Sequence, residues 1–175
     1  QFNHPNIIKA YDRGIIQSTN GVNDPKPFIV FEFVSGLTFL QVFEKNLCQE
    51  SIILLLVHLL DALKYGSTKG MHYQDLQLAN MMMTVDNNLK IVDLESFVSL
   101  ASKAEEDSLM NIHHFIKQIL KKSGCAKEKI TKPMKEALKM THEKGLTGVE
   151  LHISILEEWS LILQSQLNIK DKNDD

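Results

Sequence analysis

Apolar and polar positions divide the chain into a strand-forming first part and a helical second part. Strand-forming residues run over Ile7–Ile16, interrupted by Asp12-Arg13-Gly14, and over Phe28–Phe33, which lies between Pro27 and Gly36. Turn dipeptides at Asn20-Gly21 and Asp24-Pro25 predict a loop between these two segments.

The middle of the chain combines a buried helix with a hairpin. Gln49–Tyr65 is predicted to be helical, and its apolar residues cover nearly every face, which is typical of a helix at the centre of a domain. Met81–Thr84 and Leu89–Val92 flank Asp86-Asn87-Asn88, and this pattern predicts a short hairpin.

Helical periodicity dominates the rest of the chain. Glu105–Lys122 carries an apolar stripe made of Leu109, Ile112, Phe115, Ile116 and Ile119. Further helices are predicted over Met134–His142, ending near Gly145, and over Val149–Leu163. Strands and a hairpin followed by three helices give the fold class α+β, mostly helical.

Composition narrows the class of protein. The chain has 175 residues, of which 43% are hydrophobic, so it can bury a core. A net charge of -3 gives no basic field for nucleic acid.

Two cysteines, Cys48 and Cys125, argue against a disulfide scaffold or zinc module and fit a cytoplasmic, intracellular protein. The longest apolar run, Ile52–Leu60, is too short to span a membrane. Because the chain begins with Gln1, we expect a fragment of a longer protein.

The polar residues around the predicted hairpin are the strongest candidates for chemistry. Asp75 and Asn80 lie in the loop between the buried helix and the hairpin, and Asp93 ends the hairpin's second strand. If the hairpin folds back, their oxygens converge as hard ligands of the type that Mg²⁺ prefers, and one carboxylate remains to orient a hydroxyl nucleophile. The alternative is that Asp75 and Asn80 cap a turn and Asp93 merely ends a strand.

This segment resembles the protein kinase family. The family's catalytic loop reads H-R-D-L-x-x-x-N and is followed by a hairpin and D-F-G. Here Tyr73-Gln74-Asp75-Leu76-Gln77-Leu78-Ala79-Asn80 precedes Asp93-Leu94-Glu95. The approach to the loop (62–72), the strand and hinge (28–36) and His4-Pro5-Asn6-Ile7-Ile8 are similar in the same order. The resemblance covers roughly residues 1–95 and, more loosely, the helices to about Leu163.

The resemblance implies a fold and a division of the chain. Residues 1–34 would be a remnant of the N-terminal lobe with the hinge. Residues 35–166 would be a kinase-like helical C-terminal lobe, and residues 167–175 a polar tail. The family's Gly-rich loop, the lysine of its third strand and that lysine's glutamate partner would precede His4.

The resemblance also implies roles for single residues, with ATP and Mg²⁺ as cofactors. Asp75 would accept or orient the proton of the substrate hydroxyl, with Gln77 near the transferred phosphate. Asn80 and Asp93 would hold Mg²⁺. The adenine pocket would be formed by Phe31, Glu32, Val34, Met82 and Val92. Asp107 would anchor the catalytic loop from below, or be an ordinary acidic residue in the first turn of a helix.

Departures from the family pattern keep three functions open. The family's Gly-rich loop, third-strand lysine and its glutamate partner would lie upstream of the given residues, which we expect to reflect truncation. Tyr73-Gln74 replaces His-Arg, and Gln77 replaces the lysine usual in Ser/Thr kinases. Glu95 replaces the D-F-G glycine, and only thirteen residues separate Asp93 from Asp107, without A-P-E. The first function is an ATP-dependent protein kinase, with Ser/Thr specificity expected because that class is common. Its partners would be ATP and a protein substrate. The others are a pseudokinase that regulates a partner protein and a kinase-like small-molecule phosphotransferase.

Three other residues are weaker candidates. His113 and His114 are expected to be a surface pair rather than a metal site, because nothing completes the ligand set. Trp159 is expected to anchor the packing of the last helix.

Overall fold

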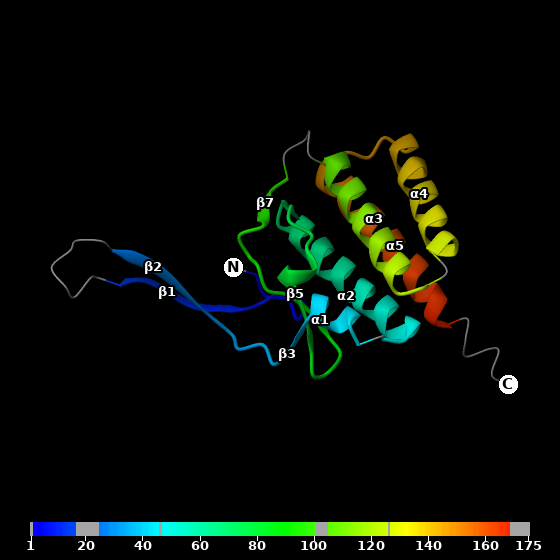
Figure 1. Ribbon diagram of the computed structural model, residues 1–175. Helices are drawn as coiled ribbons and strands as arrows, with labels where there is room; N and C mark the ends of the chain where they lie inside the picture. The colour runs from blue at the N-terminus through cyan, green and yellow to red at the C-terminus, as the bar shows by residue number, and fades with distance from the viewer. Residues whose placement is uncertain (1, 17–24, 46, 101–104, 126, 169–175) are drawn as a thin grey trace.

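The first two strands form a ribbon that extends away from the rest of the molecule (Figure 1). The computed structural model describes residues 2–16, 25–45, 47–100, 105–125 and 127–168. Strands β1 (Ala10–Ile16) and β2 (Lys26–Phe31) pair antiparallel. The predicted break at Asp12-Arg13-Gly14 is wrong, because β1 continues through it and a register shift between Ala10 and Asp12 accommodates the irregularity. Most of the loop predicted between the strands falls outside the described residues.

The ribbon carries apolar side chains on both faces. Cross-strand pairing places Ile29 beside Arg13 on one face and Phe28 beside Gly14 on the other. All six residues of β2 are exposed, and so are Tyr11, Ile15 and Ile16 of β1. A two-stranded ribbon without a packed face is marginally stable by itself in water, so this part of the fold depends on its attachment to the body.

A three-stranded sheet links the ribbon to the body. Strand β5 (Met81–Thr84) lies between β3 (Gly36–Thr38) and β6 (Leu89–Ile91), all antiparallel. The predicted hairpin is confirmed, and Asn87 adopts a φ of 58° at its turn. The pairing of β3 was not predicted. Thr38 then caps the short helix α1 (Phe39–Phe43) in a reciprocal capping box with Gln41.

A second pair of short strands borders the loop that carries Asp75. Strand β4 (Met71–Tyr73) pairs with β7 (Phe97–Ser99), so that Tyr73 faces Phe97. A short 3₁₀ helix, η1 (Leu78–Asn80), leads from the loop into β5. The chain therefore turns back along β4 within a few residues of Asp93.

Four long helices form the body. They are α2 (Gln49–Thr68), α3 (Glu105–Lys122), α4 (Lys127–Glu143) and α5 (Gly148–Asn168). The predictions for α2, α3 and α5 are confirmed apart from their ends. Helix α4 begins seven residues before the predicted Met134 and contains Pro133. The turn that Pro133 weakens is held because Ile130 and Met134, on either side of it, are both buried.

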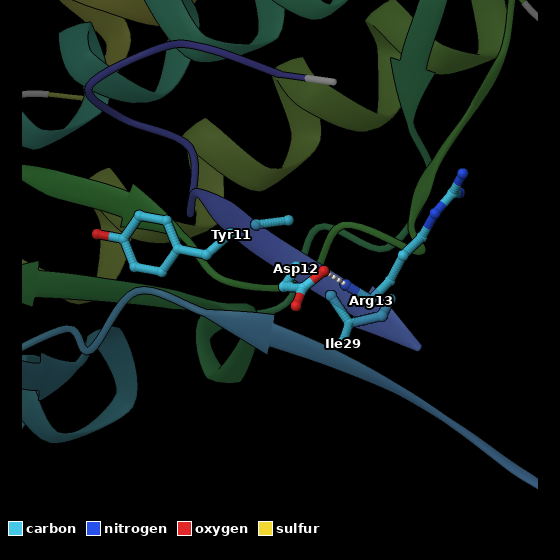
Figure 2. A pocket seen from close by; sticks show the side chains of 5 residues that line it. Tyr11, Asp12, Arg13 and Ile29 are labelled. Atoms are coloured by element: carbon cyan, nitrogen blue, oxygen red, sulfur yellow. Dashed lines mark hydrogen bonds between the residues drawn. The ribbon is translucent and has the colours of Figure 1, made fainter. Parts of the chain in front are cut away.

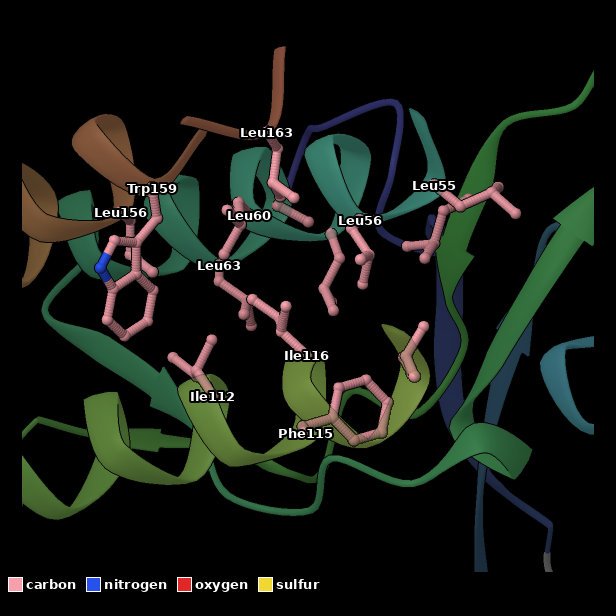
Figure 3. Close-up of a cluster of buried hydrophobic side chains, with 14 of the residues drawn as sticks. Leu55, Leu56, Leu60, Leu63, Ile112, Phe115, Ile116, Leu156, Trp159 and Leu163 are labelled. Atoms are coloured by element: carbon pink, nitrogen blue, oxygen red, sulfur yellow. The ribbon is translucent and has the colours of Figure 1, made fainter. Parts of the chain in front are cut away.

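Helix α2 lies at the centre of the core, as its pattern predicted. It packs against α5, β4 and β6. Leucines of α2 meet Ile112 and Ile116 of α3 and Leu156 of α5 in one cluster (Figure 3). Among the described residues, α2 is the one helix long and apolar enough to cross a membrane by length and composition alone. A core helix has the same composition, and the burial of α2 accounts for its apolar residues.

Trp159 anchors the helical core, as predicted. Its side chain is fully buried, and its indole Nε1 donates to the carbonyl oxygen of Met134 at 2.8 Å. The ring of His113 lies 5.8 Å from that of Trp159, and its Nε2 lies 3.2 Å from the Thr131 carbonyl oxygen. The prediction of a surface histidine pair is therefore wrong for His113, which is part of this packing. His114 is exposed and contacts Gln118.

The resulting fold is mixed, with five helices and three small sheets among the described residues. This composition is compatible with part of a protein kinase fold.

Candidate functional site

The loop that carries Asp75 is fixed at both ends by secondary structure. Strand β4 leads into it, and η1 and β5 follow it. Inside the loop, the Gln77 amide donates to the Asp75 carbonyl oxygen at 2.9 Å, and the Asn80 amide donates to the Gln77 carbonyl oxygen at 3.1 Å. These backbone bonds place Asp75, Gln77 and Asn80 on one short, ordered turn.

The side chains of this turn are bonded to one another. Gln77 Nε2 donates to Asp75 Oδ1 at 2.6 Å, and Asn80 Nδ2 donates to Asp75 Oδ2 at 3.1 Å and to the Asp75 carbonyl oxygen at 3.2 Å. Both carboxylate oxygens of Asp75 are thus held by neutral donors. With its Nδ2 used in this way, Asn80 has its amide oxygen Oδ1 available for a cation.

Asp93 is held in a similar way just beyond β6. Its Oδ1 accepts the Glu95 amide at 3.0 Å, and its Oδ2 accepts the Ser96 hydroxyl at 2.5 Å. The Val92 amide donates to the Asn80 carbonyl oxygen at 2.9 Å, which connects the end of the hairpin directly to the loop. The folding back of the hairpin therefore brings Asp93 to the Asp75–Asn80 turn.

A buried tyrosine hydroxyl lies beneath these groups. Tyr73 is 2% exposed, and its hydroxyl oxygen has no hydrogen-bond partner among the described residues. Burial raises the pKa of this hydroxyl far above its usual value, and the charges of Asp93 and Asp75 act in the same direction. Ser96 and Asn80 oppose this shift of the pKa, although neither makes a hydrogen bond of normal geometry with the hydroxyl.

The hinge segment is fixed through the side chain of Glu32. Lys90 Nζ lies 2.5 Å from Glu32 Oε1, which also accepts the Lys9 amide at 2.8 Å. Burial would raise the pKa of Glu32, but the bonds from Lys90 and Lys9 outweigh it and lower the pKa below its usual value. The Glu32 amide donates to the Lys9 carbonyl oxygen, so its own carbonyl is the backbone group left for a ligand.

The other residues expected around adenine come from β2, the segment that follows it, β5 and the end of β6. Met82 and Val92 are half-buried, Val34 is half-buried, and Phe31 is 37% exposed. Met82 pairs with both Thr38 and Lys90 in the three-stranded sheet.

A cavity of about 470 Å³ lies on the ribbon of β1 and β2, beside the end that meets the hinge. It is lined by Ala10, Tyr11, Asp12, Arg13 and Ile29 (Figure 2). Its volume is in the range of small-molecule sites. None of these lining residues belongs to the predicted adenine set, although Ala10 pairs with Phe31.

Asp107 does not have the expected anchoring position. It is exposed, and among the described residues no hydrogen bond joins it to the Asp75 loop. The buried neighbour is Ser108, whose hydroxyl lies 3.2 Å from His152 Nε2. His152 Nδ1 lies 2.8 Å from the Ser67 hydroxyl, so this histidine connects α2, α3 and α5.

Sequence reasoning missed three residues of the site. Tyr73 was noted only as a replacement for histidine, and neither Ser96 nor Lys90 was singled out. Ser96 lies three residues after Asp93, close enough in the chain for its hydroxyl to reach the carboxylate. No local pattern indicates that Lys90 reaches Glu32, fifty-eight residues away.

Asp75, Asn80 and Asp93 would hold Mg²⁺ only together with further oxygen ligands from water or phosphate. Asp93, Asp75 and Asn80 carry hard oxygen ligands on the loop and at the adjoining end of the hairpin. Among the described residues, no cluster of three or more His, Cys, Asp or Glu side chains is arranged to hold a metal ion. Water and phosphate oxygens would have to complete the coordination.

Comparison with known proteins relates the chain to protein kinases. It is 31% identical over 97 residues to the probable serine/threonine-protein kinase PknB of Bifidobacterium longum, covering 53% of this chain and 14% of the relative. It is 30% identical over 93 residues to the serine/threonine-protein kinases PknB of Mycolicibacterium smegmatis and Mycobacterium tuberculosis, covering 52% of this chain and 14% of each. No family model matches the chain.

These similarities support a relationship to the protein kinase superfamily through part of a domain. The matched region spans about one seventh of the length of the curated relatives.

Proposed function

We propose that this chain contributes the catalytic loop and metal-binding residues of an ATP-dependent phosphotransferase of the protein kinase type, with Ser/Thr side chains of proteins as substrates. One observation carries the proposal: Asn80 Nδ2 donates to Asp75 Oδ2 at 3.1 Å, and the Val92 amide donates to the Asn80 carbonyl oxygen at 2.9 Å, which brings the neighbouring Asp93 to the same loop. The relationship to serine/threonine kinases supports the same activity.

The three residues would divide the chemistry. Asn80 Oδ1 and the Asp93 carboxylate would hold Mg²⁺, which would neutralise charge on the phosphates of ATP. Asp75 would orient the substrate hydroxyl and accept its proton. The Gln77 amide, bonded to Asp75 Oδ1, would fix the orientation of that carboxylate.

A second candidate is a nucleotide-binding pseudokinase. The observation that favours it is the bonding of Asp75, both of whose oxygens are held by Gln77 and Asn80. Asp75 would have to exchange one of these two bonds before it could accept a proton from a substrate hydroxyl. Gln77 also brings no positive charge toward a transferred phosphate, which lowers the stabilisation of the transition state.

Binding and turnover measured on the same full-length protein separate the two candidates. We expect Mg²⁺ and ATP together to raise the melting temperature of the wild type, because a ligand that binds only the folded state stabilises it. Asp93→Asn should remove the shift, whereas Asp86→Asn, a matched change at an exposed turn of the hairpin, should retain it. Unchanged binding in Asp93→Asn would contradict the metal assignment.

Transfer of labelled phosphate from ATP to a mixture of protein substrates then tests catalysis. Under the first proposal, wild type transfers phosphate and Asp75→Asn binds ATP normally but transfers none. Binding without any transfer in the wild type establishes the pseudokinase. Transfer to a small metabolite in place of protein would replace the proposed substrate class.

A further inference from the structure

The hydrogen bonds within the candidate site do not include the Tyr73 hydroxyl, although this hydroxyl is buried there. A buried hydroxyl normally has a hydrogen-bond partner, because leaving one without a partner costs free energy. Tyr73 is 2% exposed and has none among the described residues. A phenylalanine would fill the same space against Phe97, whose ring centroid lies 4.9 Å away, without this cost.

The nearest candidate partner of Tyr73 is engaged elsewhere. The Ser96 hydroxyl donates to Asp93 Oδ2 at 2.5 Å. Because Tyr73 pairs with Phe97 across β4 and β7, Ser96 is the residue next to the cross-strand neighbour of Tyr73. The Gln74 amide also donates to the Ser96 carbonyl oxygen at 2.9 Å, which fixes the Ser96 backbone beside Tyr73. Ser96 also lies near enough to the Tyr73 hydroxyl to influence its pKa, so the two hydroxyls are neighbours.

We propose that Tyr73 is a positioning residue that accepts the Ser96 hydroxyl when the Asp93 carboxylate turns to a magnesium–nucleotide ligand. This inference rests on the proposed function of the site. In the ligand-free chain the Ser96 hydroxyl bonds Asp93, and the Tyr73 hydroxyl has no hydrogen-bond partner among the described residues. In the loaded chain Asp93 gives up the Ser96 bond for the cation, and the Ser96–Tyr73 bond replaces it. The Tyr73 hydroxyl would therefore gain its hydrogen bond only when the magnesium–nucleotide ligand is bound.

This exchange changes the balance between the two states. A group that is unpartnered only in the free chain raises the free energy of that chain and leaves the loaded chain unaffected. Its removal therefore stabilises the free chain and weakens ligand binding at the same time. A side chain that only fills the core would affect folding stability and leave the affinity for ligand unchanged.

Tyr73→Phe in the full-length protein tests the exchange. We expect the melting temperature without ligand to stay equal or rise by a few degrees, and the affinity for Mg²⁺-ATP to fall about three- to tenfold. Tyr65→Phe is the matched control, because the Tyr65 hydroxyl accepts the Asn3 amide away from the site. It should leave the affinity unchanged. Equal affinity in wild type and Tyr73→Phe would overturn the inference.

A double-mutant cycle identifies the partner. If Tyr73 acts through Ser96, Tyr73→Phe should have no further effect on affinity in a Ser96→Ala background, since the same bond is already absent. Additive effects of the two substitutions would overturn the assignment of Ser96. Absence of Mg²⁺-dependent binding in the wild type would instead refute the proposed function, and the inference with it, so the two failures are distinguishable.

Discussion

Lys90 of β6 and Glu32, the residue that follows β2, form an ion pair with 2.5 Å between Nζ and Oε1. Both side chains are less than one quarter exposed, at 16% and 22%. The pair joins the protruding ribbon to the hairpin that ends at Asp93. Partial burial reduces the screening of the charges, so this pair should contribute more to stability than a fully exposed pair.

Lys90→Met should therefore loosen the ribbon. We expect a loss of about 1–2 kcal/mol in the free energy of unfolding, because Glu32 would remain partly buried without its charged partner. Hydrogen exchange should accelerate at the amides of β2, such as Ile29 and Val30. Chemical denaturation and exchange followed by mass spectrometry measure the two effects.

The matched control for this change is Lys139→Met. Lys139 and Glu143 form a pair 3.9 Å apart on α4, with side chains 80% and 65% exposed. Its removal should cost at most about 0.5 kcal/mol. Equal losses for the two lysines would show that the Lys90 pair does not attach the ribbon.

Gln77→Lys should increase turnover if the chain belongs to an active phosphotransferase. A lysine at this position would bring a positive charge to the transferred phosphate, so we expect the rate of phosphate transfer to rise at least about tenfold. Steady-state transfer by the full-length protein, with Gln77→Ala as a control for loss of the Asp75 bond, measures the effect. A rate that falls equally in both variants would show that the Gln77–Asp75 bond matters more than charge.

Acid should destabilise the helical core through His152. Burial lowers the pKa of His152 to about 4, and the neighbouring His72, whose own pKa is lowered by burial, acts in the same direction. The unfolded chain therefore binds more protons below pH 6.5. Stability is fully present above that pH and is lost progressively down to about pH 4, by ~3 kcal/mol for His152. Urea denaturation between pH 7.5 and pH 4.5 measures the slope.

His152→Gln should flatten this pH dependence while lowering stability at pH 7, because it disturbs the bonds to Ser67 and Ser108. His114→Gln, at an exposed site on α3, should leave the slope unchanged. The assignment fails if both variants retain the wild-type slope.

Adding a side chain at Gly36 in β3 should destabilise the fold. A Cβ at this position would lie 2.1 Å from the Met83 carbonyl oxygen in the paired strand β5. Gly36→Ala must therefore displace backbone, and we expect a loss above about 2 kcal/mol in unfolding free energy. Gly70→Ala, where φ is 69° but the space is open, should cost only about 1 kcal/mol. Thermal denaturation of both variants, which share the same side-chain change, separates crowding from backbone strain.

Long periodic segments were predictable from the sequence, and very short ones were not. The stripe of α3 and the apolar faces of α2 contain enough residues to show their period, and both helices form where that period indicates. Strands β3, β4 and β7 have three residues each, too few to show alternation. Their positions depend on tertiary pairing.

For Asp107 the sequence left two interpretations open, an anchor of the catalytic loop and an ordinary acidic residue in the first turn of a helix. The stripe from Leu109 to Ile119 fixes the buried face of α3, and Asp107 falls with the exposed Met110 and His114 on the opposite face. Periodicity alone would have placed Asp107 in solvent. For Asp75, Asn80 and Asp93 the local pattern and the resemblance agreed, and the structure brings these residues together. Their chemical roles remain predictions for the experiments above.

The single tryptophan gives this molecule a selective optical reporter. Trp159 is buried between α4 and α5, and its indole bond ends on Met134. Its emission will follow the opening of the helical body and will not register detachment of β1 and β2, where Tyr11 is the nearest fluorophore. Unfolding monitored by emission and by far-ultraviolet dichroism should therefore separate into two curves whenever the ribbon melts first.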